Sequence, residues 1–295
     1  MPIALRAPAK LNLHLAVGAR RADGYHDVTT VLVALDLSDD VTVEPAPALS
    51  LICEPDVGVA PERNLAWRAA LAMGDAFGRS PDFAIRIAKH VPAGAGLGGG
   101  SADAAAVIAA LAEAWCVSCD DPRLGSVAAA LGADVAFPLH GGCALYEGRG
   151  EALSRRLELP RAHFAIARGA EPVPTADAYA TFDRLGGGAD PGTGRLEAAL
   201  AAGDPAALGA ALHNNMTPAA LELVPAIGDT LGFMAAADGC LGSALCGSGS
   251  AVFGVFGNAG HAAAAAVHAR GRGWWAVAAR PRAGGTLDQT TGAIQ

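Results

Sequence analysis

The chain has 295 residues, of which 52% are hydrophobic and 17% charged, so it can bury a sizeable core and is not expected to be disordered. Its formal net charge of −8 argues against a general nucleic-acid binder, which needs a basic surface to neutralise phosphates. We expect a cytoplasmic protein without membrane contacts, because the sequence has no run of about 18 strongly apolar residues and does not start like a signal peptide.

The first half of the chain reads as a group of strands followed by alternating helices and strands. Extended segments rich in β-branched residues predict strands at residues 3–17, 28–35, 40–45, 49–53 and 83–90. Helices are predicted at residues 64–77, 102–115 and 122–131, the first of them capped by Asn64. The helix at 102–115 is apolar on most faces, so we expect it to be buried.

The second half begins after a hairpin around residues 146–150. Strands are predicted at residues 162–167, 242–245, 251–256 and 274–280, and helices at 195–202, 205–214, 218–237 and 259–270. Glycine and proline predict a loop at residues 186–194. We therefore expect two domains, residues 1–155 and 156–284, followed by a loose tail at residues 285–295.

A glycine-rich segment between the strand at 83–90 and the helix at 102–115 is the firmest functional feature. It reads Pro92, Ala93, Gly94, Ala95, Gly96, Leu97, Gly98, Gly99, Gly100, Ser101, Ala102. Glycines allow successive N–H groups to form a concave anion site, and the helix that follows adds its positive end. Ser101 is placed to cap that helix or to contact a phosphate or its metal ion. The segment therefore predicts a phosphate-binding loop.

Other interpretations of this loop fit less well. The Walker A motif requires a lysine where Gly100 stands. A dinucleotide-binding GxGxxG pattern does match at Gly94, Gly96 and Gly99, but the acidic residues about 20 positions later fall in a predicted turn. A flexible linker is disfavoured, because linkers seldom join a strand directly to a capped, buried helix.

Two charged residues offer a reaction for the phosphate loop. Lys10, Asn12 and His14 alternate with leucines and so share one face of a strand, which is either solvated or lines a cleft. Asp134 follows Gly132 and is either a turn former or a catalytic carboxylate. Together, a carboxylate beside an ammonium can accept the proton of a hydroxyl group as its oxygen attacks phosphorus.

Two further segments leave alternatives open. Tyr25 and His26 follow a turn, where they could stack on and hydrogen-bond a planar base or simply lie partly buried under a hairpin. The turn of Gly247, Ser248 and Gly249 could supply donors to a phosphate or substrate, or be only a tight hairpin.

Taken together, these segments resemble the GHMP kinase superfamily, whose loop reads Pro-x-x-x-Gly-Leu-Gly-x-x-x-Ser/Ala, as at residues 92–102. Within it, the chain is most similar to the kinases that act on a cytidyl-diphosphate methylerythritol in non-mevalonate isoprenoid synthesis. Their Ala-Lys-Leu-Asn-Leu and Arg-x-Asp-Gly-Tyr-His motifs occur at residues 9–13 and 21–26. Similar segments also occur at residues 64–65, 98–100, 132–135 and 247–249.

The resemblance implies an α/β (α+β) two-domain fold with the active site between the domains. An N-terminal ATP-binding domain would carry a mixed sheet and helices, and a C-terminal α/β domain would bind substrate. It implies ATP with Mg²⁺ as cofactors and small-molecule partners only. The sequence leaves the oligomeric state open between a monomer and a homodimer. Other GHMP kinases, acting on homoserine, mevalonate or a sugar, and a non-catalytic nucleotide-binding protein on the same scaffold remain alternatives.

The resemblance also implies roles for individual residues. Lys10 and Asp134 would be the catalytic pair, Tyr25 and His26 would recognise cytosine, and Asn12 would lie near the methylerythritol hydroxyls. Asn64 and Lys89 would lie near adenine, while Thr175, Tyr179, Gly247, Ser248 and Gly249 would belong to the substrate cleft. The chain departs from the family at Ser101-Ala102, where Ser-Ser is common, and at Asn214-Asn215, where Asn-Asp is common.

Overall fold

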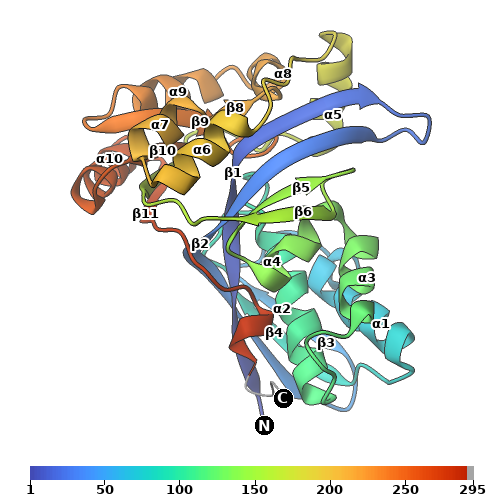
Figure 1. Cartoon of the computed structure of the whole chain (residues 1–295). Coiled ribbons are helices and arrows are strands. Elements are labelled where there is room, and N and C mark those ends of the chain that lie inside the picture. Colours follow the sequence, from blue (N-terminus) through green and yellow to red (C-terminus); the bar gives the residue numbers. More distant parts are fainter. Residues whose placement is uncertain (291–295) are drawn as a thin grey trace.

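The computed structural model describes residues 1–290, which form two sheets with helices packed against them. Figure 1 shows the long strands β1 (Ile3–Arg20) and β2 (His26–Pro45) crossing the molecule from the end that holds the N-terminus to the opposite end. The first sheet has the order β3-β4-β2-β1-β8, with β5 paired to β2 and β6 paired to β5. Its other strands are β3 (Ser50–Glu54), β4 (Phe83–Ala88), β5 (Cys143–Glu147), β6 (Ala152–Leu157) and β8 (His213–Asn214).

The helices of the first part of the chain pack around one buried helix. They are α1 (Leu65–Phe77), α2 (Gly99–Ala114), α3 (Pro122–Leu131) and α4 (Ala136–His140), with 3₁₀ turns η1 (Pro61–Arg63) and η2 (Ala133–Val135). Every residue of α2 from 102 to 112 is buried, and most of these are alanine. Small side chains let α2 lie close to α1, β1 and β2, so the start of α2 is held firmly beneath the glycine-rich loop.

The second sheet is antiparallel, with the order β11-β7-β10-β9. Its strands are β7 (His163–Arg168), β9 (Cys240–Leu245), β10 (Val252–Phe256) and β11 (Trp275–Ala279). The helices of this part are α5 (Thr175–Arg184), α6 (Gly194–Ala202), α7 (Pro205–Ala210), α8 (Thr217–Leu223), α9 (Ile227–Ala235) and α10 (Ala259–Gly271). No helix within residues 1–290 is long and apolar enough to cross a membrane.

Several predicted boundaries were wrong for identifiable reasons. The strands expected at 28–35 and 40–45 are one strand, because residues 38 and 39 keep their pairing with β1. Helix α2 begins at Gly99, three residues before its predicted start. The helix expected at 218–237 is divided into α8 and α9, with Pro225 between them, as expected from a missing N–H donor. Residues 213 and 214 leave the predicted helix to pair with β1, and α5 was not predicted.

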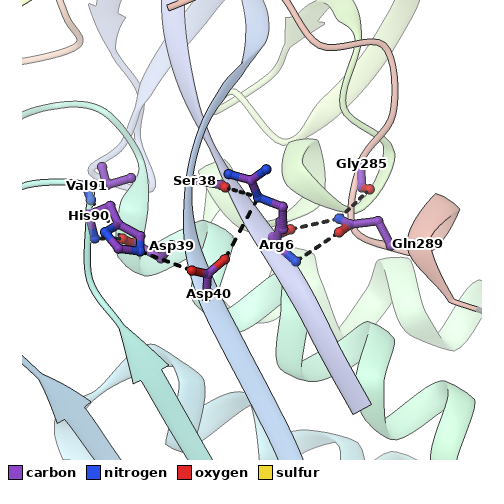
Figure 2. Close-up of polar contacts among 8 residues, drawn as sticks. All are labelled: Arg6, Ser38, Asp39, Asp40, His90, Val91, Gly285 and Gln289. Atoms are coloured by element: carbon purple, nitrogen blue, oxygen red, sulfur yellow. Dashed lines mark hydrogen bonds and ion pairs between the residues drawn. The ribbon is translucent and has the colours of Figure 1, made fainter. Parts of the chain in front are cut away.

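The last described residues do not form the loose tail predicted from residue 285. Figure 2 shows the Gln289 side chain accepting from Arg6 N at 2.9 Å and donating to Arg6 O at 2.8 Å, as a neighbouring strand would. Thr286 is fully buried, and Leu287, in η3 (Leu287–Gln289), joins the core around α2. This polar segment is therefore held by the burial of Leu287 and by the two hydrogen bonds between the Gln289 amide and the backbone of Arg6. Residues 291–295 of the predicted tail lie outside the described residues.

Candidate active site

Three neighbouring cavities share the side chain of Thr175, and the glycine-rich loop lines two of them. The catalytic cavity, of about 360 Å³, is lined by Lys10, Asn12 and Asp134. The loop cavity, of about 430 Å³, lies between the loop and Asn64. The outer cavity, of about 840 Å³, is lined by Tyr25 and His26. The sequence-predicted residues from distant segments therefore meet around one connected space.

The glycine-rich loop presents an open helix end to these cavities. Gly94, Gly96 and Gly98 have φ values of +67°, +78° and +72°, which other residues rarely adopt. Gly98 precedes the first turn of α2, and no side chain caps that turn. The first N–H groups of α2 are thus left for an anion, which the positive end of the helix also favours. Ser101 lies in this first turn and lines both the loop and catalytic cavities.

The loop is fixed from both sides by backbone contacts. Lys10 N donates to Leu97 O at 2.9 Å, and Ala251 N donates to Ala95 O at 3.1 Å. Gly96 lies so close to the second glycine turn that a Cβ atom there would be 2.0 Å from Cys246 O. Only glycine fits at this position, because the glycine-rich loop and the chain leading into the turn at 247–249 pack closely together.

Lys10 is held by a chain of hydrogen bonds on the polar face of β1. Its Nζ donates to Asn12 Oδ1 at 2.7 Å, and Asn12 Nδ2 donates to Thr30 Oγ1 at 2.9 Å. Thr30 in turn donates to His14 O at 2.8 Å. Asp134, on η2 between α3 and α4, places Oδ2 3.9 Å from Lys10 Nζ. The structure thus brings the predicted pair together and fixes the ammonium more tightly than the carboxylate.

Tyr25 and His26 face different partners although they are neighbours in sequence. His26 is buried, its Nε2 lies 2.7 Å from Asp183 Oδ1, and its ring centre is 5.1 Å from that of Tyr179. Tyr25 is 56% exposed, and the Arg149 guanidinium carbon lies 4.9 Å from the centre of its ring. The outer cavity therefore offers an accessible aromatic face beside an imidazole whose orientation is fixed.

Asn64 and Lys89 both line the loop cavity, but their functional groups have protein partners. Asn64 caps α1, because its Oδ1 accepts from Ala66 N at 3.0 Å. Lys89 Nζ is buried between Asp39 and Asp103, at 2.7 Å from Asp103 Oδ2. Burial raises the pKa of Asp103 to about 7, although the Lys89 ammonium opposes this shift. Lys89 therefore neutralises carboxylates beneath the loop.

Asp39 ties this buried group to the start of the loop. Its Oδ1 accepts from His90 N at 2.5 Å and from Val91 N at 2.8 Å, as Figure 2 shows. Sequence reasoning did not identify Asp39 or Asp103. The available signal was the position of Asp103 within an otherwise apolar helix, because a buried carboxylate requires a partner.

The second glycine turn is positioned by an amide that the sequence left without a role. Asn214 Nδ2 donates to Leu245 O at 2.9 Å and to Gly247 O at 2.8 Å. Asn215 accepts from Val17 N at 2.9 Å and donates to Val17 O at 3.0 Å. Ser248 Oγ lies 3.5 Å from Thr175 Oγ1 at the start of α5. The two asparagines therefore join the second sheet and the turn to β1.

Comparison with known proteins places this architecture in a family. Residues 64–142 match the N-terminal domain of GHMP kinases, and residues 196–273 match the GHMP kinase C-terminal domain. A 4-diphosphocytidyl-2-C-methyl-D-erythritol kinase from Mycolicibacterium gilvum is 47% identical over 239 residues, which are 78% of this chain and 74% of the relative. The chain belongs to the GHMP kinase family. The Mycobacterium tuberculosis kinase of the same name is 45% identical over 236 residues, with 78% and 74% covered.

Solved GHMP kinases share the whole fold. A crystal structure of 4-(cytidine 5'-diphospho)-2C-methyl-D-erythritol kinase aligns with a TM-score of 0.79 and 35% identity, covering 96% of this chain and 100% of that one. The homoserine kinase of Cytophaga hutchinsonii aligns with a TM-score of 0.72, covering 97% and 96%, but its 21% identity indicates the fold alone. The predicted two-domain fold is therefore confirmed, and GHMP kinase membership implies the use of ATP.

Proposed function

We propose that this GHMP kinase transfers the γ-phosphoryl group of ATP to the 2-hydroxyl of 4-(cytidine 5'-diphospho)-2-C-methyl-D-erythritol, in the non-mevalonate isoprenoid pathway. The observation that carries the proposal is the arrangement of the three cavities. One lies on the phosphate loop, one holds Lys10 and Asp134, and one holds Tyr25 and His26. Relatives that are 45–47% identical carry the name of this kinase, which supports the choice of acceptor.

The catalytic cavity has the groups that phosphoryl transfer requires. Asp134 would accept the proton of the attacking hydroxyl, because its half-exposed carboxylate is open to a bound ligand. Lys10 would offset the negative charge that gathers between this carboxylate and the phosphoryl group. Among residues 1–290 its Nζ donates one hydrogen bond, to Asn12, so donors remain for a phosphoryl oxygen. The site lowers the barrier to phosphoryl transfer mainly by positioning the reactants and by stabilising the charge of the transition state.

The nucleotide would bind with its phosphates at the start of α2 and its adenine in the loop cavity. Within residues 1–290, no three His, Cys, Asp or Glu side chains gather in a way that could hold a metal ion. This fits Mg²⁺ that arrives with ATP, since this ion keeps several waters and needs few protein ligands. Ser101 is the residue placed to contribute an oxygen. When bound, Mg²⁺ withdraws charge from the phosphate oxygens.

We place this chemistry in the cytoplasm, at a site between domains 1–155 and 156–284.

The test is ADP release by the purified protein with ATP, Mg²⁺ and a panel of acceptors. We expect release with the cytidyl-diphosphate methylerythritol and none with homoserine, mevalonate or a sugar. Phosphorus NMR should place the new phosphate on the 2-hydroxyl, and CDP should compete with the acceptor. Turnover of homoserine or mevalonate would favour a different GHMP kinase. ATP binding without transfer to any acceptor would favour a non-catalytic protein.

A further inference from the structure

The catalytic cavity and the outer cavity meet along a wall that contains one cation. The residues that line both cavities are Val28, Gly132, Ala133, Arg149, Thr175 and Tyr179. Among them only Arg149 is positively charged. Of these two cavities, Lys10 lines only the catalytic one, and Arg20 lines only the outer one. Arg149 therefore marks the passage between the two spaces.

Arg149 is held in place while the end of its side chain stays free. It lies in the turn between β5 and β6, where Glu151 accepts from Arg149 N at 2.7 Å and from its Nε at 3.3 Å. The guanidinium also lies over the Tyr25 ring, an arrangement that favours a cation. Its two Nη atoms donate to no residue within 1–290, and the side chain is 38% exposed. A positioned guanidinium with free Nη donors is suited to an anion with two acceptor oxygens.

The shape of the proposed substrate determines which of its groups lies beside Arg149, where the two cavities meet. A ligand with its base at Tyr25 and His26 and its reacting hydroxyl at Asp134 must pass Arg149. In a nucleoside-diphosphate-linked alcohol, the segment between base and alcohol carries the negative diphosphate. We propose that Arg149 binds this diphosphate and so selects alcohols that are linked to a nucleoside diphosphate. The inference rests on the proposed function, since it assumes that the base and the hydroxyl occupy these two cavities.

The ATP phosphates are a less suitable partner for Arg149. Arg149 shares the catalytic cavity with Gly98 and Ser101, but it does not line the loop cavity, in which we place the nucleotide. A purely structural role, in which Arg149 only supports Tyr25, makes a different prediction. It would weaken binding of any cytidine ligand, with or without phosphates, whereas diphosphate binding affects only the phosphorylated ones.

The experiment compares Arg149→Gln and Arg149→Lys with Arg155→Gln. Arg155 pairs with Glu197 on the surface of β6 and lines none of the three cavities, so its variant is a matched control. The measurements are KM for both substrates and inhibition by CDP and by cytidine at saturating ATP. Thermal unfolding establishes that each variant is folded.

For Arg149→Gln we expect KM for the cytidyl-diphosphate acceptor and the inhibition constant of CDP to rise by about 10- to 100-fold. Inhibition by cytidine and KM for ATP should stay at wild-type values, and Arg149→Lys should recover part of the loss. Equal losses for CDP and cytidine, a higher KM for ATP, or no change would each overturn the inference. If the wild-type protein turns over the acceptor and Arg149→Gln matches it, only this inference fails. If the wild type does not turn it over, the proposed function fails and this inference fails with it.

Discussion

Lys10 and Asp134 face each other across 3.9 Å, yet the Lys10 side chain is 5% exposed and the Asp134 side chain is 48% exposed. The buried ammonium is fixed by Asn12, whereas the carboxylate stands at the edge of the cavity. A fixed charge and an accessible base are the two elements that a hydroxyl-activating site needs. Because Asp134 is half exposed and Lys10 is buried, replacing Asp134 should change catalysis with little effect on stability.

Replacing the accessible partner should affect chemistry and leave stability intact. We expect Asp134→Asn to lower kcat by about 10²- to 10⁴-fold, because the amide cannot accept the proton of the acceptor hydroxyl. The temperature of unfolding should stay close to that of the wild type, since the side chain is half exposed. Asp177→Asn, at an exposed site in α5, is the control and should retain full turnover. Near-normal kcat in Asp134→Asn would remove Asp134 from the mechanism.

Replacing Lys89, the lysine buried beneath the glycine-rich loop, should lower the stability of the protein before it affects nucleotide binding. Lys89→Met leaves Asp39 and Asp103 buried without their cation, so we expect a loss of about 3–5 kcal/mol in the free energy of unfolding. Denaturant unfolding without ATP measures this loss. A residue that acted only on adenine would leave the ligand-free protein as stable as the wild type, and that result would contradict the arrangement described here.

The glycines of the phosphate loop should differ sharply in their tolerance of a methyl group. Gly96→Ala places Cβ 2.0 Å from Cys246 O at a positive φ, so we expect a loss of about 2 kcal/mol or more in stability and weaker binding of ATP. Gly100 is the matched control, because its Cβ would have its nearest neighbour at 4.0 Å. Gly100→Ala should unfold at nearly the wild-type temperature. Equal stability of the two variants in thermal unfolding would show that the packing at Gly96 is not restrictive.

His14 should make the protein less stable in mild acid. Burial lowers the pKa of His14 below 6.5, against the attraction of Asp190 and together with the repulsion of His213. Below pH 6.5 the unfolded chain therefore takes up a proton at this residue that the folded chain resists, so the contribution of His14 to the free energy of unfolding falls as the pH drops. This contribution is fully present above pH 6.5, and it is lost as the pH falls towards the lower pKa that His14 has in the folded state.

The measurement is the change in unfolding free energy between pH 7.5 and pH 5.5. His14→Asn should show a smaller change than the wild type, by up to about 1.4 kcal/mol, because one pH unit of this range lies below 6.5. His268→Asn, at an exposed position of α10, should keep the wild-type slope. An unchanged slope in His14→Asn would mean that the buried ring does not govern this pH range.

Local sequence patterns were enough to predict most elements and the place of the glycine-rich loop between β4 and α2. The glycines of the loop, the cap at Asn64 and the alternation around Lys10 are short-range signals that the structure retains. The chain contains only two lysines, Lys10 and Lys89, and both side chains are buried. That scarcity in a chain rich in arginine was a further signal, because a buried lysine requires a specific partner.

Contacts between distant segments were beyond such patterns. Asp183 is in contact with His26, and Arg149 with Tyr25, only because the fold brings α5 and the β5–β6 turn to the end of β1. The roles of Asn214 and Asn215 likewise depend on which backbone atoms lie opposite them. Docking of Leu287 depends on the apolar cluster that other segments of the chain form around α2. Spacing along the chain carries no information about these distances.

The close packing of Gly96 on the Cys246 carbonyl has a mechanical consequence. The phosphate loop belongs to the first domain and the turn at 247–249 follows a strand of the second, and they touch without room for a methyl group. The two domains therefore cannot part at this point without losing the contact. An opening motion of the cleft would pivot here, with the widest excursion at the outer cavity, where Tyr25 and α5 lie. The acceptor would then enter and leave at the moving edge while the phosphate site stays still.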